Sequence, residues 1–180
     1  AIAFAVVMDN QPAVAQAVCD YLCEKISLLP RITWTSPKAK WIHEKNIKPS
    51  LNNMKFDNSY VVEAINSLLQ VWVNSREDKT IVIVSTVMPG TCKEVLEPII
   101  KNWTTNNIFK HNINLLYSPE FIELGTVIYN LRFPDMTLVG CNNPKEAKVF
   151  LDVMANVIKN NAEVSIINLR EAEIVKILVN

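Results

Sequence analysis

The sequence predicts an α/β domain in which helices flank a mostly parallel sheet. Short apolar or β-branched runs recur along the chain, and they alternate with segments whose apolar residues repeat at helical spacing. Strands that are buried on both faces of a parallel sheet have this unbroken apolar character. Polar residues directly follow several of the runs, and this is where open α/β sheets bind ligands. The 180 residues are enough for one domain with a sizeable core.

The first part of the chain is expected to begin with strand, helix and strand. The strands are residues 2–8 and 31–35, and the helix between them ends near residue 28. This order opens a Rossmann-like, dinucleotide-binding unit, which normally has a glycine-rich first turn and an acid after its second strand. Residues 7–12 contain no glycine, and Ser36 and Pro37 follow the second strand. We therefore expect the N-terminal half of the fold to be degenerate or shortened.

The alternation continues through the second part of the chain. Asp57 or Ser59 is placed to cap the first of its helices, Pro144 begins another, and Leu169 opens a final helix that reaches Asn180. The predicted helices are 59–74, 92–102, 127–131, 144–159 and 169–180, and the predicted strands are 80–84, 113–116, 137–139 and 164–167.

Composition excludes several classes of function. The formal net charge is zero, so the chain lacks the basic character of a non-specific nucleic-acid binder. Its apolar runs are too short to span a bilayer, and we identify no signal peptide. Cys19 and Cys23 could share a helix face but have no further ligands nearby, so we expect no metal site. Buried thiols and a cytoplasmic location are the expectation.

Two segments place polar groups at the ends of predicted strands. Residues 85–91 offer hydroxyls and free backbone amides at a strand-to-helix turn, which suit an anionic or ribose-bearing ligand. After the strand 113–116 the chain presents Glu120 and Glu123 beside Gly125. These acids are either ligand-binding groups or surface residues at a helix start, where the helix dipole favours them.

The final helix carries a second polar set. Glu173, Lys176 and Asn180 fall at i, i+3 and i+7, on one face of a helix that is otherwise almost entirely apolar. A lysine in a buried helix must be paired or used. Spacing alone favours a Glu173–Lys176 ion pair over a catalytic role, and both interpretations stay open at this point.

Taken in series, these segments resemble the UDP-glucose/GDP-mannose dehydrogenase family. The resemblance covers about residues 57–180, and order and spacing both agree. The matching segments are 57–61, 85–91, 117–121 with Gly125, 134–140, and 172–176 with Asn180.

The resemblance implies a function and roles for particular residues. The family uses two molecules of NAD to oxidise C6 of a nucleotide sugar from alcohol to carboxylate. Ser85 and Thr86 would lie near the nicotinamide ribose, Thr86 also near a catalytic water, and Glu120 would be the acid/base. Lys176 would stabilise oxyanion charge, and Asn180 would help to hold the sugar. Glu120, Phe121, Ile122, Lys176 and Asn180 would form the substrate contacts.

The resemblance also implies a domain organisation. Residues 1–168 would form the NAD-binding-type domain, and residues 169–180 would begin the family's long connecting helix. The family's nucleophilic cysteine lies beyond that point, so we expect a truncated or shortened chain that does not complete the oxidation alone. Dimers form through the long helix, so a homodimer would be weakened.

The chain also departs from the family. Leu124 stands where the family has an acid, Glu123 lies one position early, and the glycine fingerprint is absent, which counts against NAD binding. Two alternatives follow. One is a non-catalytic remnant or scaffold with a Rossmann-like fold. The other is a β-hydroxyacid-type dehydrogenase, which would explain the helical lysine but not residues 119–121. The sequence does not identify the sugar nucleotide.

Overall fold

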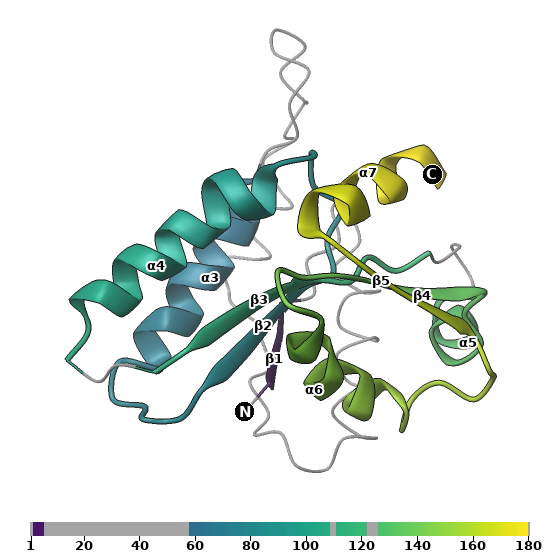
Figure 1. Cartoon of the computed structure of the whole chain (residues 1–180), viewed down its shortest axis with the longest axis horizontal. Coiled ribbons are helices and arrows are strands. Elements are labelled where there is room, and N and C mark those ends of the chain that lie inside the picture. Colours follow the sequence, from purple (N-terminus) through teal and green to yellow (C-terminus); the bar gives the residue numbers. More distant parts are fainter. Residues whose placement is uncertain (1, 6–57, 109–110, 122–125, 180) are drawn as a thin grey trace, which may run out of the picture.

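A computed structural model describes residues 2–5, 58–108, 111–121 and 126–179 of the chain. Within these ranges, five strands form one sheet in the order β1-β2-β3-β4-β5, so each strand lies beside its neighbour in sequence (Figure 1). The strands are β1 (Ile2–Ala5), β2 (Lys79–Ile83), β3 (Ile113–Tyr117), β4 (Met136–Gly140) and β5 (Glu163–Ile167). The sheet is mostly parallel, which confirms the predicted fold class.

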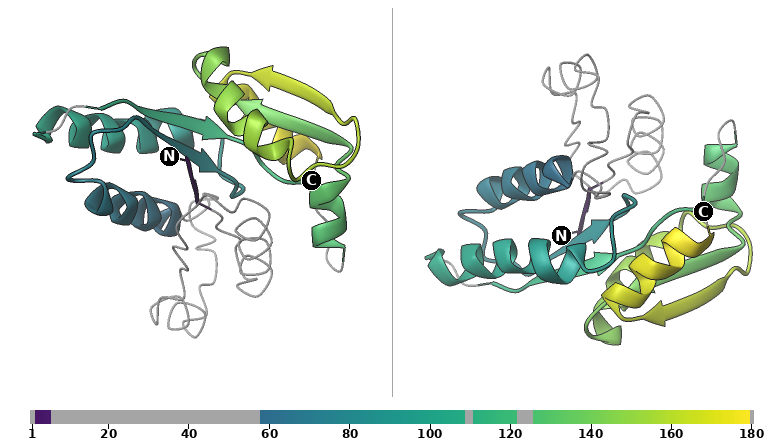
Figure 2. Two further views of the ribbon diagram at one scale, coloured as in Figure 1. Left: turned by 90° about the horizontal axis from the view of Figure 1, so that it is seen from below. Right: turned by 90° about the horizontal axis from the view of Figure 1, so that it is seen from above.

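The sheet consists of two parallel groups that meet at a single antiparallel step. β1, β2 and β3 pair in parallel, as do β4 and β5, whereas β3 and β4 are antiparallel and paired at Tyr117 and Gly140. Those two residues are the last of their strands, so the carboxyl ends of both groups meet there. The two groups extend away from this junction in opposite directions (Figure 2). In open α/β sheets, ligands bind outside the carboxyl ends of the strands, which here meet at this junction.

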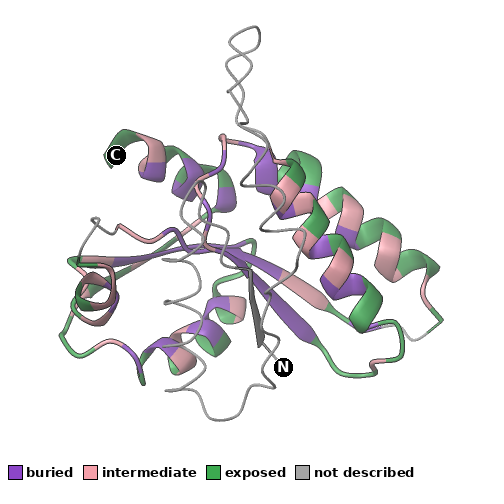
Figure 3. Ribbon diagram, turned by 180° about the vertical axis from the view of Figure 1, so that it is seen from behind, coloured by how far each residue is buried: buried purple, intermediate pink, exposed green. Residues whose placement is uncertain are grey.

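Helices cover both faces of the sheet. On one face lie α3 (Ser59–Val71), the π-helical turn η1 (Cys92–Leu96), α4 (Glu97–Asn106) and α7 (Leu169–Val179), whose buried residues share one apolar cluster. On the other face, α5 (Val127–Arg132) and α6 (Pro144–Met154) contribute to a second cluster. Figure 3 shows the buried sides of α3 and α4 turned towards the strands. Of the helices in the described ranges, none is long and apolar enough to cross a membrane.

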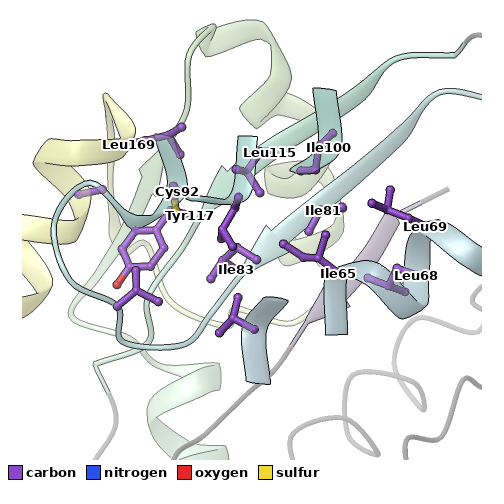
Figure 4. Close-up of a cluster of buried hydrophobic side chains, with 14 of the residues drawn as sticks. Ile65, Leu68, Leu69, Ile81, Ile83, Cys92, Ile100, Leu115, Tyr117 and Leu169 are labelled. Atoms are coloured by element: carbon purple, nitrogen blue, oxygen red, sulfur yellow. The ribbon is translucent and has the colours of Figure 1, made fainter. Parts of the chain in front are cut away.

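β2 and β3 supply side chains to both clusters, because successive side chains of a strand point to opposite faces of the sheet. Ile81, Ile83, Leu115 and Tyr117 belong to the first cluster, and Val82 and Leu116 to the second. Figure 4 shows the first cluster, where Tyr117 and Leu169 lie close to Cys92. Burial on both faces explains why these strands appear in the sequence as continuous apolar runs.

Gly140 brings α7 close to the sheet. A side-chain Cβ at this position would lie 2.7 Å from the Cβ of Ala172 and 3.1 Å from the Cα of Leu169. Both residues are buried in the first turns of α7. Absence of a side chain at the last residue of β4 therefore allows α7 to pack directly over the junction of the two strand groups.

The predicted elements agree with the structure in type, and several boundaries need correction. α6 ends at Met154 and α3 at Val71, earlier than their apolar repeats suggested. The helix after β2 begins with a π-helical turn, and the N-cap of α3 is Asn58, without a side-chain hydrogen bond. The predicted helix and strand before residue 36, and the degenerate turn between them, lie outside the described residues.

Candidate active site at the strand junction

The corner after β3 carries the predicted acid. Tyr117 pairs with Ile83 in the parallel register, and the backbone N–H of Ser118 donates to the carbonyl of Ile83 at 2.9 Å. The segments that follow β2 and β3 therefore leave the sheet side by side. Glu120 lies three residues past the end of β3, half-buried, at the carboxyl edge of the sheet.

Lys176 reaches this corner from α7. Its Nζ donates to the backbone carbonyl oxygen of Glu120 at 3.0 Å, across 56 residues of sequence, and lies 5.0 Å from the ring centroid of Phe121. The Lys176 side chain is 6% exposed. An ammonium held by a carbonyl dipole and an aromatic face keeps favourable contacts after it loses water. The structure thus places the predicted acid segment and the predicted lysine in direct contact.

Burial changes the proton affinity of both groups. It raises the pKa of the Glu120 carboxyl to about 7, and the Lys176 ammonium offsets part of this rise. Burial also lowers the pKa of Lys176 from its usual range, while the Glu120 carboxylate acts in the opposite direction. Near neutral pH the carboxyl of Glu120 can therefore both accept and donate a proton, which general acid/base catalysis requires.

Glu173, one turn before Lys176, is fully buried and has different partners. Its carboxylate accepts hydrogen bonds from the backbone N–H of Gly90 at 2.5 Å and of Cys92 at 2.7 Å. The simpler interpretation of the sequence, a Glu173–Lys176 ion pair, is therefore replaced by two separate contacts. Glu173 binds the turn after β2, and Lys176 binds the corner after β3.

The same contacts correct the expectation for residues 85–91. The backbone amides of this turn were expected to be free for an anionic ligand, but the carboxylate of Glu173 accepts hydrogen bonds from the N–H of Gly90 and from that of the next helix's first residue, Cys92. Gly90 has a φ of 97°, a left-handed conformation that favours glycine, and it aims its N–H at Glu173. Ser85 is buried and Thr86 half-buried just after β2, so their hydroxyls remain the candidates for a ribose contact.

Several predicted site residues lie outside the described residues. Ile122 and Asn180 fall in this group, as does Gly125, which matches the family pattern, and as do Glu123 and Leu124, at which the sequence departs from it. Cys19 and Cys23 fall there too. The structure therefore describes Ser85, Thr86, Glu120, Phe121 and Lys176 of the proposed site.

The cysteines in the described ranges, Cys92 and Cys141, are both buried free thiols. Burial raises the pKa of the Cys92 thiol well above its usual range, and the negative charge of Glu173 adds to this effect. A thiol with a raised pKa is a poor nucleophile near neutral pH. No group of three or more metal-binding side chains occurs within the ranges that the structure describes.

The role of Glu173 is the feature that the sequence analysis missed. The spacing of three residues to Lys176 suggested a local pair, whereas the actual partners lie more than 80 residues earlier in the chain. One signal was present: a carboxylate on an almost wholly apolar helix requires hydrogen-bond donors wherever it is buried. Which donors these are depends on tertiary packing.

A mostly parallel sheet with helices on both faces, and polar groups at its carboxyl edge, defines a Rossmann-like domain. A family model described as "UDP-glucose/GDP-mannose dehydrogenase family, NAD binding domain" matches residues 47–159. The chain belongs to this family.

Curated relatives agree with this assignment. UDP-glucose 6-dehydrogenase of Rickettsia bellii is 30% identical over 128 residues, which are 71% of this chain and 27% of the relative. GDP-mannose 6-dehydrogenase of Azotobacter vinelandii is 25% identical over 65% of this chain and 28% of its own length. The chain thus spans little more than a quarter of the length of these relatives.

Solved structures of similar fold come from the same group of enzymes. A GDP-mannose dehydrogenase from Pseudomonas aeruginosa superimposes with a TM-score of 0.63 at 24% identity, covering 73% of this chain and 29% of that one. A UDP-glucose dehydrogenase from Pyrobaculum islandicum gives 0.59 at 25% identity, covering 69% and 27%. Both likenesses support the Rossmann-like fold.

Proposed function

We propose that this chain serves the NAD-dependent oxidation of a nucleotide sugar, of the UDP-glucose or GDP-mannose type, from C6 alcohol to carboxylate. One observation carries the proposal: the Nζ of Lys176 lies 3.0 Å from the carbonyl oxygen of Glu120 at the junction of the strand groups. An acid with a pKa near neutrality and a buried cation beside it are the two groups that oxidation of an alcohol needs.

The residues divide the chemistry between them. The carboxylate of Glu120 accepts the proton of the sugar hydroxyl, directly or through a water, and then releases it to solvent. Lys176 stabilises the negative charge that develops on the oxygen, because its ammonium is buried and already oriented. Phe121 holds the ammonium from one side and limits access of water. Ile122 and Asn180 are proposed as further substrate contacts.

NAD, when bound, supplies the acceptor for hydride. The residues that would hold it here are Ser85 and Thr86, whose hydroxyls follow β2 at the same carboxyl edge of the sheet. The amides of Gly90 and Cys92 would not contribute, because Glu173 occupies them. A pyrophosphate therefore needs a different set of backbone donors, and β1 is the strand whose carboxyl end normally provides them.

Calorimetry separates this proposal from a non-catalytic scaffold. We expect NAD, titrated into the chain to millimolar concentration, to give saturable heat, and Thr86→Val to weaken that binding. An exposed threonine on α4, replaced as Thr105→Val, serves as the matched control and should bind NAD as the wild type does. No heat at millimolar NAD would contradict the proposal and favour the scaffold.

A further inference from the structure

The buried contact between Glu173 and the turn after β2 holds a residue of the proposed reaction in place. Glu173 and Lys176 are three residues apart on α7, so they lie on neighbouring parts of one helix face. Glu173 is fixed by two backbone donors, the N–H groups of Gly90 and Cys92. The Glu173 contact therefore sets the rotation of α7 and its height above the sheet one turn before Lys176.

The turn that Glu173 binds belongs to the proposed cofactor side of the site. It continues directly from Ser85 and Thr86, and Gly90 adopts its left-handed conformation there. The Glu120 carbonyl that Lys176 binds belongs to the proposed substrate side. Because α7 contacts both corners, a shift at the Glu173 contact must move the ammonium relative to Glu120.

We propose that Glu173 is a positioning residue, which anchors α7 to the turn after β2 so that the ammonium of Lys176 stays over Glu120 and Phe121. The catalytic meaning of this anchor rests on the proposed function, but the anchor itself does not. A carboxylate shared between two buried amides suits this task, because hydrogen bonds to a charged group are strong and directional. A glutamine at this position can accept only with its oxygen and would turn an amide donor towards a backbone donor.

Amine labelling of the whole chain, mapped by mass spectrometry, tests the anchor. Lys79 provides an internal control, since it is also 6% exposed but lies at the opposite end of β2, paired with Glu77 at 3.0 Å. In Glu173→Gln we expect Lys176 to be acylated at least about tenfold faster than in the wild type, with Lys79 unchanged. Glu171→Gln, an exposed carboxyl on the same helix, should leave both rates unchanged.

Two outcomes overturn the proposal. The first is a folded Glu173→Gln variant in which Lys176 stays as protected as in the wild type. The second is equal acceleration at Lys176 and Lys79, which reports global unfolding. Glu173→Asp adds a graded test, because it keeps the charge but shortens the reach by one methylene group. We expect it to give an intermediate rate at Lys176.

The wild-type chain gives a test that requires no variant to fold. In urea below the unfolding transition, Lys176 acylation and Cys92 alkylation should rise together and before Lys79 acylation, because one local opening exposes both groups. Exposure of Lys176 while Cys92 remains protected would overturn the anchor. These labelling rates do not involve NAD or sugar nucleotide, so failure of the anchor is distinguishable from failure of the proposed function.

Discussion

Two acids at the carboxyl edge of the sheet, the fully buried Glu173 and the half-buried Glu120, have opposite environments. Glu173 lies on α7 and faces the turn after β2, where both of its carboxylate oxygens accept hydrogen bonds from backbone N–H groups. Glu120 lies in the corner after β3, where burial raises the pKa of its carboxyl to about 7. One helix, α7, contacts both corners, through Glu173 and Lys176. The two fixed donors make Glu173 a structural element, whereas the raised pKa of the Glu120 carboxyl suits it to proton transfer.

The largest loss of stability is expected when the hydrogen bonds of the Glu173 carboxylate are removed. Glu173→Ala leaves two buried N–H groups without an acceptor and opens a cavity beneath α7, so the free energy of unfolding should fall by about 3 kcal/mol or more. Urea denaturation measures this change. Glu171→Ala, at an exposed position on the same helix, should cost much less. Equal losses in the two variants would mean that the Glu173 carboxylate contributes no special stability.

The second effect concerns the packing that holds α7 over both corners. Gly140→Ala would place a Cβ 2.7 Å from that of Ala172, and we expect a loss of about 1–3 kcal/mol in unfolding free energy. Removing the opposing methyl group in the double variant Gly140→Ala/Ala172→Gly should recover part of the loss, less about 1 kcal/mol for glycine in a helix. Thermal unfolding of the three proteins measures the coupling. A double variant less stable than the sum of the single changes would contradict the close approach.

A third, smaller effect is the pH dependence of stability that the raised pKa of Glu120 should cause. The folded-state pKa of Glu120, about 7, lies above the ordinary value of 4.5, so the folded state binds the proton more tightly than the unfolded state. Stability from this group is complete below about pH 4.5, falls as the pH rises to about 7, and is constant above that. Glu120→Gln should remove this decline, whereas Glu163→Gln, at an exposed position on β5, should retain it. Urea midpoints measured from pH 4 to pH 8 give the two profiles.

The smallest effect comes from an ion pair outside both corners. Lys148 and Asp152 on α6 lie 2.6 Å apart, but both side chains are more than half exposed, at 74% and 63%. Lys148→Met should change the unfolding free energy by about 0.5 kcal/mol or less. A loss as large as that of Glu173→Ala would mean that an exposed ion pair stabilises the fold as much as the buried contacts of Glu173.

The sequence predicted the fold well because its signals are local. Continuous apolar runs identified β2, β3 and β4, and helical repeats identified α3 and α6, although propensity extended α6 beyond Met154. What local patterns could not predict was the single antiparallel step at Tyr117 and Gly140. That step depends on which strand edges pair, and it brings the two carboxyl edges together.

The site residues likewise separate into those that local sequence signals could identify and those that depend on tertiary packing. Glu120 and Lys176 could be selected as chemically unusual residues in an apolar context, and the resemblance to the family assigned their roles. The partner of Glu173 could not be selected, because backbone amides carry no sequence signature. The turn at Gly90 illustrates this: the residue type indicated a special conformation, and only the packing of α7 determined which carboxylate its N–H binds.

Glu120 and Lys176 share one environment at the strand junction, where the ammonium of Lys176 acts on the carboxyl of Glu120. The most direct test is an NMR titration of the side-chain carboxyl carbon of Glu120 in the wild type and in Lys176→Met. We expect a wild-type midpoint near 7 and a higher midpoint in the variant, because the ammonium lowers the pKa of Glu120. A wild-type midpoint near 4.5 that Lys176→Met leaves unchanged would contradict this expectation.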